Sequence, residues 1–230
     1  MSQWATTIVS RLTRVRDLRR ERDAGPGLGA RVQAVKQFQH ARFVRDYAAL
    51  LANPRYRDAA LFFLDELYGP ADFAARDAEF ERVVPWMARV LPEEVLHTIA
   101  DLIELHSLTE ELDQQMAAAL RSHDLDERSY RGAWRLVGRR ADRERQLALL
   151  LATGRALDRY TRSRVLAATL RVMRRPAQAA GLGQLQAFLE AGMAAFAGMR
   201  GAGDFLAFIE DNESRTISDF FDSKAKNPTE

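Results

Sequence analysis

The sequence contains no cysteine, and only three of its 34 Lys and Arg residues are lysine. The lack of cysteine excludes disulfides, thiolate zinc sites, iron–sulfur clusters and cysteine nucleophiles. No apolar run approaches the ~18 residues that a membrane span needs. The N-terminal arginines follow a short apolar stretch, which is the reverse of the order in a secretory signal. We therefore expect a cytoplasmic protein without a membrane span.

The pattern of apolar residues predicts an all-α protein of 230 residues, a multi-helix bundle of about nine or ten helices with short connections. Alternating strand patterns do not occur. Residues 1–24 are predicted as a basic amphipathic helix, which the glycine-rich stretch 24–29 separates from a single all-helical domain over 30–222. Residues 223–230 are predicted as a flexible tail.

Caps and helix breakers predict most of the helix boundaries. Helices are predicted over 30–52, 55–68, 141–174, 183–199 and 203–222, with helix starts at Asp72, Pro92, Ser107 and Asp126. Pro85 is predicted to kink or restart its helix and Pro176 to end its helix, because proline lacks the backbone N–H.

Charge is distributed unevenly along the chain. Residues 61–130 hold 5 Lys+Arg against 16 Asp+Glu, whereas residues 131–176 hold 13 against 3. Either these segments pack together and neutralise each other, or the basic segment 131–175 binds nucleic acid through interleaved Tyr130 and Trp134. The two aromatic residues share a helix face with Val137 and resemble core residues, so we prefer mutual neutralisation and disfavour nucleic acid.

The stretch FFLDELYGPADFAARD, residues 62–77, is the densest candidate site. Phe62 and Phe63 fit a buried helix face, and Asp77 falls within the apolar stripe of the following helix, where a carboxylate needs a partner. One interpretation is a buried Asp–Arg pair, with Arg42, Arg45, Arg55 and Arg57 as candidate partners. The alternative is the polar floor of a ligand pocket formed by Tyr68, Arg76 and Asp77.

Residues 62–68 read FFLDELY, and this segment resembles the motif of a family of uncharacterised bacterial proteins named for FFLEELY. Asp65 replaces glutamate at one position, which keeps the charge. The resemblance implies an all-helical fold for the rest of the chain. It implies no activity, because the family has none assigned.

Glu94 and His97 form an E-x-x-H pair on one helix face, and Asp101 continues the same stripe. Two such pairs with two further glutamates build a di-iron site in ferritin-like bundles. The chain has one pair only, so the alternative is a solvated polar face. His106 lies on the apolar face of this helix, which is typical of a hydrogen-bonded core histidine.

No other catalytic motif is present, which favours a non-enzymatic protein without a cofactor that acts through protein contacts, either with a partner or as a homodimer. The alternatives are a small-molecule or metal-binding protein, which could be an enzyme, and the nucleic-acid reading above. The N-terminal helix carries an apolar stripe, which suits a partner groove or an anionic membrane. We prefer docking on its own domain. The stripe consists of Ile8, Leu12, Val15 and Leu18.

Overall fold

The computed structural model describes residues 3–67, 69–120, 122 and 124–222. Over these residues the chain forms eleven α-helices and one π-helix and no strand, which confirms the all-α prediction. In chain order they are α1 (Gln3–Ala24), α2 (Leu28–Asp46), α3 (Ala48–Ala52), α4 (Arg57–Phe62), the π-helix η1 (Phe63–Leu67), α5 (Ala74–Val90), α6 (Glu93–Ala119), α7 (Glu127–Val137), α8 (Arg140–Thr161), α9 (Arg164–Ala179), α10 (Gly183–Met199) and α11 (Gly203–Asp222).

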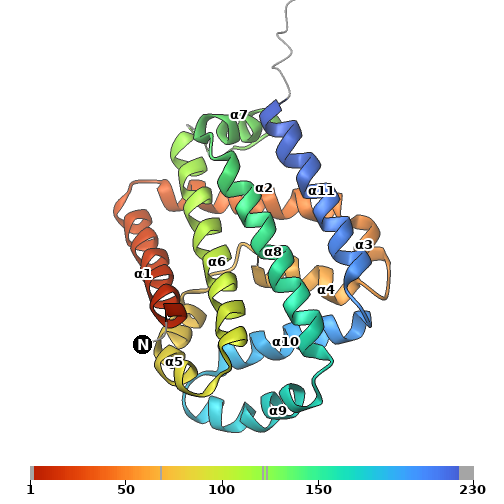
Figure 1. Cartoon of the computed structure of the whole chain (residues 1–230). Helices are drawn as coiled ribbons and strands as arrows, with labels where there is room; N and C mark the ends of the chain where they lie inside the picture. Colours follow the sequence, from red (N-terminus) through yellow and green to blue (C-terminus); the bar gives the residue numbers. More distant parts are fainter. Residues whose placement is uncertain (1–2, 68, 121, 123, 223–230) are drawn as a thin grey trace, which may run out of the picture.

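Helices α6 and α8 lie side by side at the centre of the molecule (Figure 1). Helix α1 packs along α6, and α11 packs along α8 on the other side. Helix α2 also packs on α6. At the opposite end from α7, α10 crosses the bundle and α9 lies outside it. Among the described residues, none of the helices combines the length and apolar character that crossing a bilayer demands.

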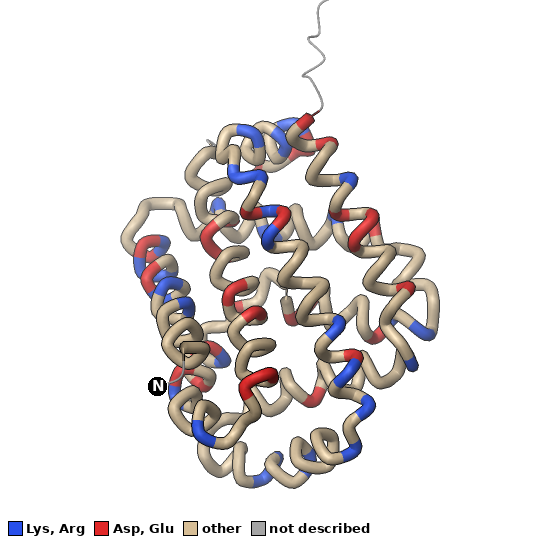
Figure 2. Tube along the Cα trace, viewed as in Figure 1, with Lys and Arg blue, Asp and Glu red and all other residues tan. Residues whose placement is uncertain are grey.

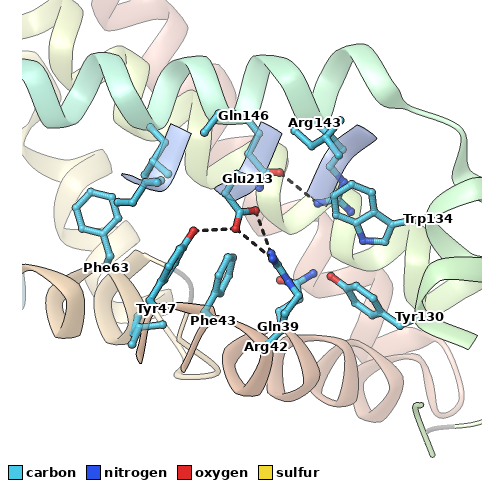
Figure 3. Close-up of a pocket in the computed structure, with 15 residues that line it drawn as sticks. Gln39, Arg42, Phe43, Tyr47, Phe63, Tyr130, Trp134, Arg143, Gln146 and Glu213 are labelled. Atoms are coloured by element: carbon cyan, nitrogen blue, oxygen red, sulfur yellow. Dashed lines mark hydrogen bonds and ion pairs between the residues drawn. The ribbon is translucent and has the colours of Figure 1, made fainter. Parts of the chain in front are cut away.

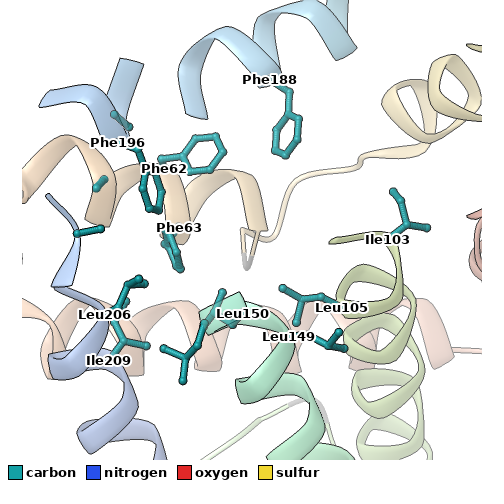
Figure 4. Packing of buried hydrophobic residues seen from close by; sticks show 14 of the residues in the cluster. Phe62, Phe63, Ile103, Leu105, Leu149, Leu150, Phe188, Phe196, Leu206 and Ile209 are labelled. Carbon is teal, nitrogen blue, oxygen red and sulfur yellow. The ribbon is translucent and has the colours of Figure 1, made fainter. Parts of the chain in front are cut away.

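The phenylalanines of the FFLDELY segment form the centre of the core, as the sequence predicts (Figure 4). The Phe62 ring lies 5.5 Å from that of Phe188, and the Phe63 ring lies 5.9 Å from that of Phe196, measured between centroids. Aromatic pairs at these separations stabilise the fold beyond what the burial of their apolar surface contributes. The core therefore joins α4 and η1 to α10.

Helix α1 docks on the bundle through its apolar stripe. Ile8 and Val15 are fully buried, and Leu12 and Leu18 are 3% and 1% exposed. The stripe faces α5 and α6, the helices against which α1 packs. It is therefore not available to a partner groove or a membrane. The predicted tail, 223–230, lies outside the described residues.

Two segments that are predicted as single helices are each divided into two elements in the structure. The helix predicted over 30–52 divides at Tyr47, whose buried side chain donates a 2.7 Å hydrogen bond to Glu213 and whose backbone leaves helical geometry. The helix predicted over 55–68 is α-helical only to Phe62 and continues as η1. The π-helix brings Phe63 and Leu64 into the core immediately before the Gly69-Pro70 stop.

Four other predicted boundaries are wrong, and one of them is Pro176, which lies inside α9 and does not end that helix. Helix α6 is continuous through Ser107, which is fully buried, so it does not cap a helix. Helix α5 continues through Pro85, because Val84 and Met87 are buried on either side and their packing outweighs the local cost. The segment 141–174 is divided at Ser163, whose Oγ accepts from the Leu166 N–H at 3.3 Å.

Candidate functional site

The predicted corner is closed by an ion pair that comes from α1. Arg19 Nη2 lies 2.6 Å from Asp77 Oδ2, and His106 Nε2 lies 2.9 Å from the same oxygen. Burial raises the pKa of Asp77, but the hydrogen bond and charge of His106 together with Arg19 outweigh it and hold this pKa below its ordinary value. The expected core hydrogen bond of His106 is thus confirmed. The prediction that Arg42, Arg45, Arg55 or Arg57 pairs with Asp77 is wrong. The docking of α1 brings Arg19 to Asp77 instead.

The other predicted residues of the corner leave little room for a ligand. Arg76 is buried, donates to the Glu66 carbonyl oxygen at 3.1 Å, and stacks its guanidinium 4.0 Å from the Phe73 ring and 4.4 Å from the Phe188 ring. The cavity beside Asp77 has a volume of about 20 Å³, which suits about one water molecule. Tyr68 lies outside the described residues. The corner has the geometry of a structural ion pair.

The Glu94, His97 and Asp101 stripe is engaged in separate contacts. His97 Nε2 lies 3.6 Å from Asp101 Oδ1, and the His97 ring stacks on Trp4 with centroids 4.3 Å apart. Glu94 Oε1 instead lies 3.5 Å from Arg159 Nη2. Within the part of the chain that the structure describes, no three His, Asp or Glu side chains gather as a metal site. Glu94, His97 and Asp101 therefore do not converge on a common point at which a metal ion could bind.

A small polar pocket lies between α2, α7, α8 and α11 (Figure 3). Arg42 Nη2 lies 3.0 Å from Glu213 Oε2, and the Tyr47 hydroxyl donates to Glu213 Oε1 at 2.7 Å. Burial lowers the pKa of Arg42, but the charge of Glu213 outweighs it and the pKa is raised overall. The pocket has a volume of about 40 Å³, enough for about two or three waters. The contacts of Glu213 with Arg42 and Tyr47 hold α11 against the C-terminal end of α2.

Within the basic segment 131–175, most arginines of residues 131–162 pair with acids. Arg139, Arg145 and Arg159 of the α8 region contact Glu111, Glu104 and Glu94 of α6, respectively. Tyr130 is fully buried and Trp134 is 5% exposed. Neither ring is therefore available for base stacking. The acidic and basic segments neutralise each other in place along the α6–α8 contact.

A larger cavity lies on the inner side of α9, next to the phenylalanines of the FFLDELY segment. Its volume is about 280 Å³, nearly twice the ~150 Å³ of an engineered protein cavity that binds benzene. None of the described residues that line it carries a charge. The lining residues are Phe62, Phe63, Leu67, Phe80, Val83, Trp86, Met87, Leu91, Val95, Thr98, Ile99, Leu102, Leu150, Thr153, Gly154, Leu157, Tyr160, Leu166, Thr169, Leu170, Met173, Ala177, Leu182, Leu185, Gln186, Phe188, Leu189, Gly192 and Met193.

Few polar atoms belong to this apolar cavity. The Thr98 and Tyr160 hydroxyl oxygens lie 2.9 Å apart and share one hydrogen bond, and the Glu94 carbonyl oxygen lies 3.1 and 3.3 Å from them, respectively. Gln186 Nε2 donates to the Leu170 carbonyl oxygen at 2.7 Å. Thr153 Oγ1 is buried and has no hydrogen-bond partner among the described residues. The lining of this cavity is therefore almost entirely apolar.

The comparison with protein families gives one match. A family described as a domain of unknown function, DUF8198, matches residues 18–227. The chain belongs to this family. The match covers the elements that line the apolar cavity and leaves out most of α1. No curated protein and no solved structure matches the chain.

Sequence reasoning missed the apolar cavity for a physical reason. Most of its lining residues belong to six α-helices and η1, and most are apolar residues of the kinds that fill ordinary cores. Periodicity identifies which face of a helix is buried, but it does not tell whether opposing faces meet or leave space. The nearest available signal was the predicted central position of Phe62 and Phe63.

Proposed function

We propose that the chain binds an apolar small molecule in the cavity between α5, α6, α8, α9 and α10. The observation that supports this function is a charge-free cavity of about 280 Å³. Proteins fill apolar interiors at near-crystalline density, so a space of this size removes packing that the fold would otherwise gain. A bound apolar molecule restores those contacts. The FFLDELY segment, which resembles the FFLEELY motif, contributes Phe62, Phe63 and Leu67 to the lining.

The ligand is an uncharged or single-tailed molecule whose apolar part enters the cavity. A buried charge without a partner would be costly there, and the lining offers none. Among the described lining residues, the Thr153 Oγ1 atom has almost no accessible surface and the Thr169 hydroxyl makes no hydrogen bond, so the lining suits a ligand with few polar atoms. Aliphatic alcohols and long-chain acyl compounds have this character.

Helix α9 provides the route by which the ligand enters. Ala177 is its one buried residue among those described, and Leu166, Leu170 and Met173 are half-buried against the cavity. Few polar contacts hold it in place. Arg174 Nε lies 2.9 Å from Glu190 Oε1, and Arg82 contacts the Gly181 carbonyl at the end of the helix. Local opening of a helix with so little burial costs less than global unfolding.

A fluorescent titration tests the proposal with the uncharged dye N-phenyl-1-naphthylamine. We expect the wild-type chain to bind the dye with enhanced fluorescence. Leu170→Trp places an indole in the cavity and should weaken dye binding by about tenfold or more. Ala168→Trp adds the same side chain at an exposed position of the same helix and should leave the affinity within about twofold. Equal affinities for the two variants would contradict cavity binding.

The prediction that the chain acts through protein contacts, or as a homodimer in the cytoplasm, is kept as a second candidate. It is supported by Trp86 and Val90, which lie one turn apart on α5 and are 50% and 51% exposed. Native mass spectrometry separates the two candidates. Retained apolar molecules of low mass favour the cavity, whereas a dimer that Trp86→Ser with Val90→Ser dissociates favours protein contacts.

A further inference from the structure

The outer face of α9 combines exposed aliphatic side chains with arginines. Val165 and Val172, two turns apart, are each 74% exposed, which makes them the most exposed large apolar residues of the described chain. Arg164, Arg171 and Arg175 are also exposed and share the outward side of the helix, opposite the side chains that line the cavity. Isolated exposed valines are ordinary. A pair at helical spacing beside three arginines forms an amphipathic surface.

The charge on this surface is not neutralised by the protein itself. Helix α9 contains four arginines and no acidic residue, and the arginine positions follow the helix in Figure 2. Arg174 pairs with Glu190. In the described part of the chain, Arg164, Arg171 and Arg175 form no ion pair, in contrast to the arginines of α8 that pair with α6. The uncompensated charge of the basic segment is therefore concentrated on one outer helix.

We propose that the outer face of α9 docks on an anionic phospholipid surface. Basic side chains near a bilayer are attracted to anionic headgroups, and apolar side chains beside them enter the boundary between headgroups and acyl chains. Val165 and Val172 favour this partner over nucleic acid, since a phosphate backbone gains nothing from exposed aliphatic groups. The sequence suggested such a role for the stripe of α1, which is buried. Helix α9 takes that role.

Docking at α9 places the apolar cavity next to the membrane, because the opposite face of the same helix covers the cavity. The evidence for docking is the charge and exposure of α9, and it does not depend on what the cavity binds. Opening of α9 at a bilayer would expose the cavity to lipid and not to water. The surface therefore gives the proposed cavity a source of apolar ligands.

Co-sedimentation of the full chain with vesicles tests the docking. We expect binding to vesicles of phosphatidylcholine mixed with phosphatidylglycerol, and little binding to phosphatidylcholine alone. The triple variant R164Q/R171Q/R175Q should weaken binding by about 100-fold, because each basic side chain near an anionic surface contributes about fivefold. The control R57Q/R128Q/R215Q removes the same charge from exposed positions on α4, α7 and α11 and should weaken it far less. Equal losses in the two triple variants would overturn the proposal.

A second variant tests the aliphatic contribution at constant charge. V165S/V172S should weaken vesicle binding severalfold, and unchanged binding would overturn the insertion of the two valines and with it the proposal. If R164Q/R171Q/R175Q loses affinity for duplex DNA but keeps its affinity for vesicles, the partner is nucleic acid and the proposal fails. The α9 variants should all retain dye binding in the cavity, so failure of docking and failure of the proposed function are distinguishable.

Discussion

Glu110 is a buried carboxylate on α6 that joins the two N-terminal helices to the bundle. It is 3% exposed, and Arg22 Nη1 of α1 lies 2.6 Å from its Oε2. Lys36 of α2 contacts its Oε1. Burial raises the pKa of Glu110, but the charges of Lys36, His106 and Arg22 outweigh burial and lower this pKa from 4.5 to about 2. The ionised form is therefore strongly favoured in the folded state.

The charge on Glu110 contributes a stability that depends on pH. Because one pKa unit corresponds to about 1.4 kcal/mol, the contribution at neutral pH is about 3 kcal/mol. A lowered pKa gives stability that is fully present above the ordinary value of 4.5 and is lost as pH falls toward about 2. Glu110→Gln should therefore lose about 3 kcal/mol of unfolding free energy at neutral pH, and the difference from wild type should vanish near pH 2.

Urea unfolding followed by circular dichroism at several pH values measures this difference. The lowered pKa of Asp77 also makes the protein acid-sensitive, but it acts equally in both chains and cancels. Asp211→Asn is the matched control, since Asp211 and Arg215 form an exposed ion pair on α11 whose side chains are 70% and 67% exposed. It should change stability little. A Glu110→Gln effect that stays constant from neutral pH to pH 2 would refute the reasoning.

Two further predictions concern the ion pair at Asp77 and the packing at helical glycines. Asp77→Asn should lower the unfolding free energy by about 2 kcal/mol, because Arg19 and His106 lose a charged partner, and leave dye affinity unchanged; a loss of dye binding at unchanged stability would instead make Asp77 part of a ligand site. A Cβ at Gly192 would lie 2.9 Å from Phe62 Cζ, so Gly192→Ala should destabilise by about 1 kcal/mol, whereas Gly132→Ala, which meets nothing within 4 Å, should stabilise by about 0.5–1 kcal/mol. Urea midpoints measure both, and a stabilising Gly192→Ala would show that Phe62 moves freely into the cavity.

Local sequence signals predicted the helices whose ends are set by local chemistry. Helices α10 and α11 occupy the predicted residues 183–199 and 203–222, divided by the glycine-rich turn. Asp126 caps α7 as predicted, since its Oδ1 accepts from the Ser129 N–H at 2.7 Å and the Ser129 hydroxyl in turn accepts from the Asp126 N–H. These boundaries depend on residues within one turn of each other, which a single sequence contains.

Features that are determined by tertiary packing could not be predicted from local sequence signals. Ser107 and Glu110 have the spacing of a capping box, but both are buried in the middle of α6. There Glu110 forms ion pairs with Arg22 of α1 and Lys36 of α2. The partner of Asp77 was missed for the same reason, because Arg19 is 58 residues away along the chain. Long-range contacts of this kind depend on how helices dock.

The chain-length dependence of ligand binding tests the proposed cavity most directly. Straight-chain 1-alkanols would be titrated against the bound dye in the wild-type chain and in Leu170→Trp. Each methylene buried in an apolar cavity gains about 0.8 kcal/mol, so the affinity of the wild type should rise about fourfold per added carbon until the cavity is full. Leu170→Trp should reach that limit at a shorter chain. Affinities that do not depend on chain length would contradict binding in the cavity.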